Sequence, residues 1–271
     1  MAEIIDAPVP AKLAEWVDAR QAQGLYFFSR GDAIKSLQMT DIAFKMAVSR
    51  LQKKERIQRI LGGFHIIVPL EFSATRVLPA EWFIADLMAH MRRPYYVGLL
   101  SAAAIHGAAH QQPQQFHVVT TGPLRRLQVR SLSVRFFSKI NFEATPVAST
   151  KVQTGFISVS TPEGTAIDLI RYARAIGGLD RVLTVLQELG ENMDQIKLVH
   201  AVKADGNLAY GQRLGWLLER AGHSELVEGL REWIRERNPL PARLEPSLPI
   251  RGAEKDQRWQ LLINTTVEAD I

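Results

Sequence analysis

The sequence contains no cysteine among its 271 residues. This absence excludes disulfide bonds, thiolate metal ligands and cysteine nucleophiles together. No apolar run approaches the roughly 20 residues that a membrane-spanning helix needs. The first ten residues, MAEIIDAPVP, also lack the basic and apolar regions of a secretory signal. We therefore expect a cytoplasmic protein that does not associate with a membrane.

Three catalytic signatures are also missing. The sequence has no Gly-Ser dipeptide of the kind that positions paired carboxylates in a nucleotidyltransferase. It has no acid followed two residues later by lysine, as a restriction-type nuclease requires, and no G-x-S-x-G elbow of a serine hydrolase. We therefore predict that the protein is not an enzyme and carries no cofactor.

The histidines do not form a convincing metal site. His106 and His110 stand at the i, i+4 spacing that suits a metal on one helix face. No glutamate lies between them, however, and no third ligand is evident. We predict no bound metal, and we interpret His106 as a structural residue in an apolar helix.

Acidic residues are absent over a long central stretch. No Asp or Glu occurs from Leu87 to Asn141, although Lys139 and six arginines lie there. The stretch could form a second nucleic-acid surface or a docking face for RNA or an acidic protein. Alternatively, acids from elsewhere in the fold could interleave with these cations. The candidate basic surface consists of Arg92, Arg93, Arg125, Arg126, Arg130 and Arg135.

Residues 29–69 carry the clearest local pattern in the chain. A helix is predicted over Gly31–Leu37 and a second over Asp41–Lys54, where apolar residues recur with helical spacing. Two strands, Arg56–Ile60 and Phe64–Val68, flank a glycine turn. A further helix is expected within Pro10–Gln23. This order predicts a winged helix-turn-helix, in which the second helix of the pair enters the DNA major groove.

Charge favours DNA binding over a purely structural helical hairpin with a solvated basic face. Six cations and one acid, Glu55, lie between Ile42 and Ile60. Cations that neutralise phosphates supply most of the non-specific affinity for DNA. Thr40 is the expected N-cap of the recognition helix. The predicted DNA-binding residues are Thr40, Lys45, Ser49, Arg50 and Lys53 on this helix, with Arg56 and Arg59 on the wing.

The rest of the chain mixes strand and helix patterns. We expect a domain boundary near residues 72–80, which separates a DNA-binding domain (1–72) from a larger domain (80–271). One helical run is predicted from Tyr95 to His110, strands follow over 116–121, 129–137 and 156–160, and helices fill most of 161–236. Asp168 is predicted to be a buried cap or salt-bridge partner. The fold class is therefore mixed α/β, of the α+β kind.

Several of these segments resemble a known family. The run YYVGLLSAAAIHG, the strand FHVVTT, the helix TPEGTAIDLIRY and the tail LEPSLPIRG…RWQLLIN occur in this order. Together with the N-terminal winged helix, they resemble the AbiEi family, the antitoxins of bacterial abortive-infection toxin–antitoxin pairs of type IV. The resemblance spans nearly the whole chain.

The resemblance implies a transcriptional autorepressor that binds double-stranded operator DNA through its winged helix. It also implies a C-terminal antitoxin domain, with a nucleotidyltransferase-like scaffold but no enzyme site. That domain would counteract a nucleotidyltransferase toxin without forming a stable complex, so RNA or a nucleotide is a possible common ligand. One alternative is a winged-helix regulator whose C-terminal domain binds a small ligand or oligomerises. An enzyme tethered to DNA is the third possibility, which the missing catalytic motifs disfavour.

Overall fold

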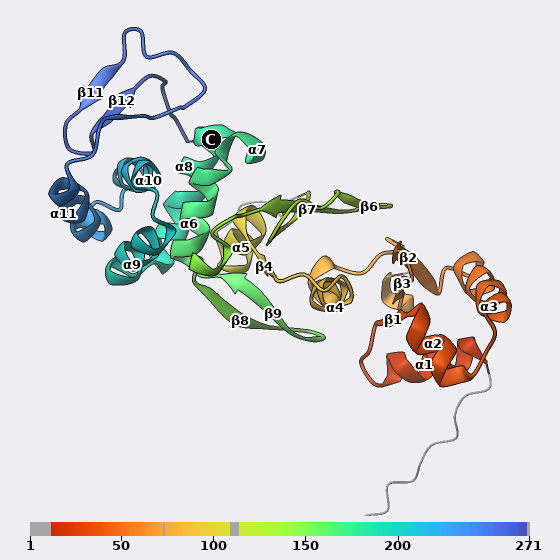
Figure 1. Ribbon diagram of the computed structural model, residues 1–271. Coiled ribbons are helices and arrows are strands. Elements are labelled where there is room, and N and C mark those ends of the chain that lie inside the picture. The colour runs from red at the N-terminus through yellow and green to blue at the C-terminus, as the bar shows by residue number, and fades with distance from the viewer. Residues whose placement is uncertain (1–11, 73, 109–113, 270–271) are drawn as a thin grey trace, which may run out of the picture. The chain divides into compact units, whose positions relative to one another are not determined.

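The computed structural model describes residues 12–72, 74–108 and 114–269. These residues form a mixed α/β structure whose strands build three sheets (Figure 1). Within this part of the chain, no helix is both long and apolar enough to cross a bilayer. The predicted α/β class is therefore confirmed.

Three helices and three strands make up the N-terminal elements. In chain order they are α1 (Leu13–Ala22), β1 (Phe27–Ser29), α2 (Arg30–Leu37), α3 (Asp41–Lys53), β2 (Ile57–Leu61) and β3 (Phe64–Ile67). The sheet order is β1-β3-β2, and both pairings are antiparallel. The predicted helices and strands of this segment are confirmed to within two residues, and α1 lies within the range expected for the first helix.

Capping side chains set the ends of the two central helices. Ser29 and Asp32 form a capping box at the start of α2, and Gln38 ends this helix in the left-handed conformation with φ of 46°. The Thr40 hydroxyl accepts a hydrogen bond from the backbone N–H of Ala43, so Thr40 is the N-cap of α3, as predicted. The inward faces of these helices pack against β1 and the β2–β3 hairpin. Together they form one apolar core, which includes Phe28.

A six-stranded sheet follows, after the short helix α4 (Ile84–His90). Its order is β6-β7-β5-β4-β9-β8, in which β4 pairs antiparallel with β5 and parallel with β9. The strands are β4 (Tyr95–Val97), β5 (Phe116–Thr120), β6 (Leu127–Val129), β7 (Leu132–Ser138), β8 (Val147–Val152) and β9 (Gly155–Ser160).

Two predictions in this region were wrong. The expected helix from Tyr95 begins instead with strand β4, and only Leu99–Ile105 form a helix, α5. Gly98 allows this change of direction, because a Cβ there would lie 2.8 Å from the Val119 side chain. The single strand expected over 129–137 is a hairpin, since Arg130 lies in a two-residue turn with φ of 53°.

Helices cover the rest of the chain up to a small C-terminal sheet. They are α6 (Pro162–Arg171), α7 (Ala173–Ile176), α8 (Gly178–Leu189), α9 (Gln195–Asp205), α10 (Leu208–Arg220) and α11 (Glu228–Arg237). The sheet has the order β10-β12-β11, formed by Ala242–Arg243, Leu261–Ile263 and Glu254–Asp256. One large apolar core joins these helices to β4 and β5, and both Trp216 and Trp233 belong to it.

The chain divides into two compact units. The first comprises residues 1–94, 125–134 and 150–157, and the second comprises residues 95–124, 135–149 and 158–271. The first unit thus continues beyond the boundary expected near 72–80. The first unit also includes the outer parts of the β6–β7 and β8–β9 hairpins. No local sequence pattern predicts that these hairpins are divided between the two units.

Candidate functional site

Helix α3 carries a mixed basic and apolar outer face. Phe44, Val48 and Leu51 are buried on its inner side. Lys45, Ser49, Arg50 and Lys53, which the sequence assigns to DNA, are all exposed. Because side chains three or four positions apart share a helix face, Ser49 and Lys53 lie on one line along the outside.

Two exposed apolar residues complete the same line and were missed from the sequence. Ile42 is 73% exposed and Met46 is 55% exposed. Both residues lie outside the inward-facing apolar stripe of α3. An apolar residue at such an outward position is the sequence signal that could have identified them. In a major groove, an apolar side chain of this kind can contact a thymine methyl group.

Intramolecular ion pairs engage part of the basic charge. Lys45 Nζ lies 3.0 Å from Asp41 Oδ2, and Arg30 pairs with the other oxygen of the same carboxylate. Hydrogen bonds from Lys45 and Arg30 lower the pKa of Asp41. On the predicted wing, Arg56 pairs with Asp18 of α1, whereas Arg59 is exposed. The arginine available for an outside contact on the wing is therefore Arg59.

The six arginines of the proposed basic surface have different environments. Arg92, Arg93 and Arg125 are exposed. Arg126 is also exposed and donates to Ser133 and Gln128. The remaining two, Arg130 and Arg135, have partners elsewhere in their own units.

Arg130 forms an ion pair with Glu55 at 3.3 Å, and both residues belong to the first unit. Arg135 belongs to the second unit, is half-buried, donates to the Ala175 carbonyl oxygen at 2.6 Å and stacks over Phe137. The alternative interpretation, in which acids from elsewhere interleave, therefore holds at Arg130. Arg126, by contrast, donates to the uncharged side chains of Ser133 and Gln128.

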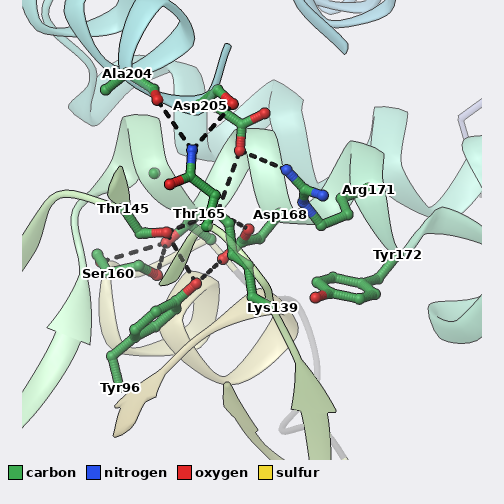
Figure 2. Close-up of polar contacts among 12 residues, drawn as sticks. Tyr96, Lys139, Thr145, Ser160, Thr165, Asp168, Arg171, Tyr172, Ala204 and Asp205 are labelled. Carbon is green, nitrogen blue, oxygen red and sulfur yellow. Dashed lines mark hydrogen bonds and ion pairs between the residues drawn. The ribbon is translucent and has the colours of Figure 1, made fainter. Parts of the chain in front are cut away.

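A buried polar network lies in the second unit, and Figure 2 shows its hydrogen bonds and ion pairs. Lys139 follows β7 and is 3% exposed, so this cation of the acid-free stretch is no part of a surface. Its Nζ lies 2.8 Å from Asp168 Oδ1, 3.3 Å from Asp205 Oδ1 and 2.6 Å from the Thr145 hydroxyl. The expected burial of Asp168 as a salt-bridge partner is thus confirmed.

The network continues on both sides of this pair. The Tyr96 hydroxyl donates to Asp168 Oδ2 at 2.7 Å, and Arg171 donates to Asp205 Oδ1 at 2.6 Å (Figure 2). Burial raises the pKa of Tyr96, and the neighbouring Asp168 charge raises it further, so the phenol keeps the proton that it donates. Burial also raises the pKa of Asp168, against the opposing effect of Lys139.

This network ties together elements that are far apart in the sequence. Its residues come from β4, from the segment after β7, from α6 and from the end of α9. The carboxylate of Asp168 is fully buried and both of its oxygens accept hydrogen bonds within the protein. Such a carboxylate is positioned to hold the fold together rather than to attack or bind an incoming molecule.

The structure offers no metal centre among its described residues, since no three His, Asp or Glu side chains gather there. His106 donates a hydrogen bond from Nε2 to the Ser160 carbonyl oxygen at 2.7 Å, which fits its predicted structural role. His110, the other residue of the considered pair, lies outside the described residues.

Comparison with known proteins identifies the larger domain. The fold is similar to the crystal structure of the RV2827C protein from Mycobacterium tuberculosis, with a TM-score of 0.67 and 14% sequence identity, over 95% of this chain and 92% of that chain. No curated protein matches the sequence. Residues 96–220 match the family described as the AbiEi antitoxin C-terminal domain. Residues 96–220 therefore form an AbiEi antitoxin C-terminal domain, which supports an antitoxin role in a toxin–antitoxin system.

Proposed function

We propose that this antitoxin also represses the transcription of its own operon by binding operator DNA through a winged helix-turn-helix. The observation that carries the proposal is the outer face of α3, a helix capped by Thr40 and followed by the β2–β3 hairpin. Lys45, Ser49, Arg50 and Lys53 are exposed on this helix. Ile42 and Met46 add apolar contacts beside them. Helix α3 would read the base edges and Arg59 would contact phosphate.

A binding experiment with the full-length protein tests the DNA-binding proposal. We expect a mobility shift on duplex DNA from upstream of its own gene, and an affinity that falls steeply between 50 and 200 mM salt, because several phosphates release counterions (about one power of salt for each contact). The variant Arg50→Ala with Lys53→Ala should lose this binding. The matched control, Arg251→Ala with Lys255→Ala, removes two exposed cations from the C-terminal part of the chain and should retain it.

Either of two results would overturn the DNA-binding proposal. If the wild-type protein shows no shift at 50 mM salt, α3 does not bind operator DNA. If the control variant loses as much affinity as the α3 variant, overall charge rather than this helix accounts for binding.

We further propose that the toxin is a nucleotidyltransferase and that the antitoxin counteracts it without a stable complex. The support is the family of the C-terminal domain and the expectation that follows from the sequence resemblance. The adjacent reading frame should encode a protein with a Gly-Ser…Asp-x-Asp pattern. A neighbour of another class would contradict the proposal. The nucleotidyltransferase-like character of the antitoxin scaffold stays a prediction.

The exposed arginines of the acid-free stretch give this proposal a second test. Arg125→Ala with Arg126→Ala, expressed together with the toxin, should reduce protection of the cells while repression of the operon persists, because α3 is unchanged. Arg251→Ala with Lys255→Ala is again the control. Full protection by a folded Arg125/Arg126 variant would show that these arginines do not act against the toxin.

A further inference from the structure

A cavity of about 330 Å³ opens in the second unit beside the end of α6. Its charged lining consists of Arg171, Arg174 and Arg213 against a single acid, Glu245. Tyr210 forms an aromatic part of the wall. None of these residues belongs to the predicted basic surface, and none lies on α3. The cavity is therefore a third cationic feature, which shares no residue with the other two.

Arg213 is buried and has no ion-pair partner among the described residues. It is 8% exposed, and its Nε donates to the Arg243 carbonyl oxygen at 2.9 Å. Within the described part of the chain, no carboxylate lies at ion-pair distance from its guanidinium group. Burial lowers the pKa of Arg213, against the smaller opposing effects of Tyr210 and of the Glu245 charge, so enclosing this guanidinium group is only partly compensated. A buried guanidinium that lines a cavity in this way is suited to bind an anion, because a poorly compensated buried charge is unfavourable.

The other two arginines surround the same space. Arg171 is held by Asp205 through one terminal nitrogen, and its guanidinium carbon lies 4.7 Å from the centre of the Tyr210 ring. The guanidinium carbon of Arg213 lies 5.9 Å from the same ring. Arg174 is exposed, and the described residues provide no ion-pair partner for it. Two of the three guanidinium groups thus stand beside one aromatic ring, which fixes their positions.

The one acid in the lining is already engaged. Glu245 Oε1 accepts hydrogen bonds from the backbone N–H and the hydroxyl group of Ser247, at 3.0 and 2.6 Å. This carboxylate stabilises its own turn and forms no ion pair with the three arginines among the described residues. In addition, Leu179 of the first turn of α8 lines the cavity, so the positive end of that helix dipole lies next to it.

The excess of guanidinium groups in the cavity lining indicates which class of anion would bind there. A lone carboxylate is satisfied by one guanidinium fork, whereas a phosphate or diphosphate offers several oxygens and more than one negative charge. The volume lies at the small end of the range for small-molecule sites. We propose that this cavity binds a small polyphosphate, either free or as the phosphate part of a nucleotide, through Arg171, Arg174 and Arg213. The proposal does not depend on DNA binding by α3.

Calorimetric titration of the full-length protein tests this site. Sodium pyrophosphate and ATP, titrated separately, should both bind, and citrate at the same concentration should bind at least tenfold more weakly. Equal affinity for pyrophosphate and ATP assigns the site to the phosphate chain alone, whereas tighter binding of ATP assigns it to a nucleotide. Both results support the proposal.

Two variants locate the binding. Arg174→Gln changes an exposed side chain, so the protein should fold normally and bind pyrophosphate at least tenfold more weakly. Arg213→Gln should reduce binding further. Arg251→Gln, which removes an exposed arginine that does not line the cavity, should bind as the wild type does. The proposal fails if neither pyrophosphate nor ATP binds at millimolar concentration, if citrate binds equally well, or if Arg174→Gln binds unchanged.

Discussion

The ammonium nitrogen of Lys139 lies 2.8 Å from Oδ1 of Asp168, and neither side chain is more than 2% exposed. Removing one member of a buried pair leaves the other charge uncompensated, at a cost of about 3–5 kcal/mol. We therefore expect Lys139→Met to lower the free energy of unfolding by this amount, as measured by urea denaturation followed by circular dichroism.

The double variant Lys139→Met with Asp168→Asn provides the matched control. It removes both charges, so it should be more stable than the single Lys139→Met variant. If Lys139→Met costs no more than the surface substitution Arg251→Met, the pair does not stabilise the fold.

The buried imidazole of His65 predicts a loss of stability in mild acid. Burial, together with the nearby Arg59 charge, lowers the pKa of His65 from an ordinary value of 6.5 to about 4. The unfolded chain therefore binds a proton that the folded chain does not between pH 6.5 and about 4. Stability is fully present above pH 6.5 and is lost as the pH falls through this window.

The variant His65→Phe should flatten this dependence, because phenylalanine can keep the stacking on Phe28 and cannot take up a proton. The free energy of unfolding, measured at pH 7.5 and pH 5, should fall less in the variant than in the wild type. His200→Gln, a change at an exposed histidine of α9, should leave the pH dependence as it is. An identical fall for wild type and His65→Phe would exclude His65 as the titrating group.

The proposed recognition helix and wing should respond differently to substitution. Ser49→Ala or Lys45→Ala should reduce discrimination between operator variants by about 1–3 kcal/mol, if these side chains reach base edges. Arg59→Ala should instead weaken binding to all sequences about equally and lower the salt dependence. Fluorescence anisotropy on a set of single-base operator variants separates the two patterns, and equal behaviour of helix and wing variants would contradict the assignment.

Gly215 on α10 should tolerate no side chain. A Cβ at this position would lie 2.1 Å from ring atoms of Trp259, which is fully buried. We expect Gly215→Ala to lower the free energy of unfolding by about 1–3 kcal/mol, the usual effect of overpacking, despite the higher helix propensity of alanine. Gly31→Ala, which meets only ordinary van der Waals distances in α2, is the control for thermal denaturation and should be neutral or stabilising. A neutral Gly215→Ala would show that Trp259 moves without cost.

The sequence by itself determined the elements whose signals are local. The helical stripe of α3 and its cap at Thr40 depend on residues within a few positions of one another, so the predicted ends agree closely with the structure. The start of α6 has a local signal of the same kind, since the Thr161 hydroxyl accepts a hydrogen bond from the Gly164 N–H. Helix capping and amphipathic spacing depend on residues that are close together in the sequence, so sequence patterns predict them directly.

Only the tertiary structure decided which short apolar runs became strands. Residues 95–97 continue into a helical pattern, but their backbone is paired by β5 on one side and β9 on the other. The exposed strand β8 carries no strong apolar pattern and was not expected. Strand formation depends on partners that lie far along the chain, so local preference is a weak guide to it.

The tertiary structure also decided which basic side chains are buried in ion pairs and which are exposed. Lys139 and Arg125 look alike in a stretch without acids, yet one is buried against Asp168 and the other is exposed. Arg213 ends beside a cavity that α6, α10 and the segment after β10 form together. The sequence determines the number and type of charges, but pairing and burial depend on which distant segments the fold brings within a few ångströms.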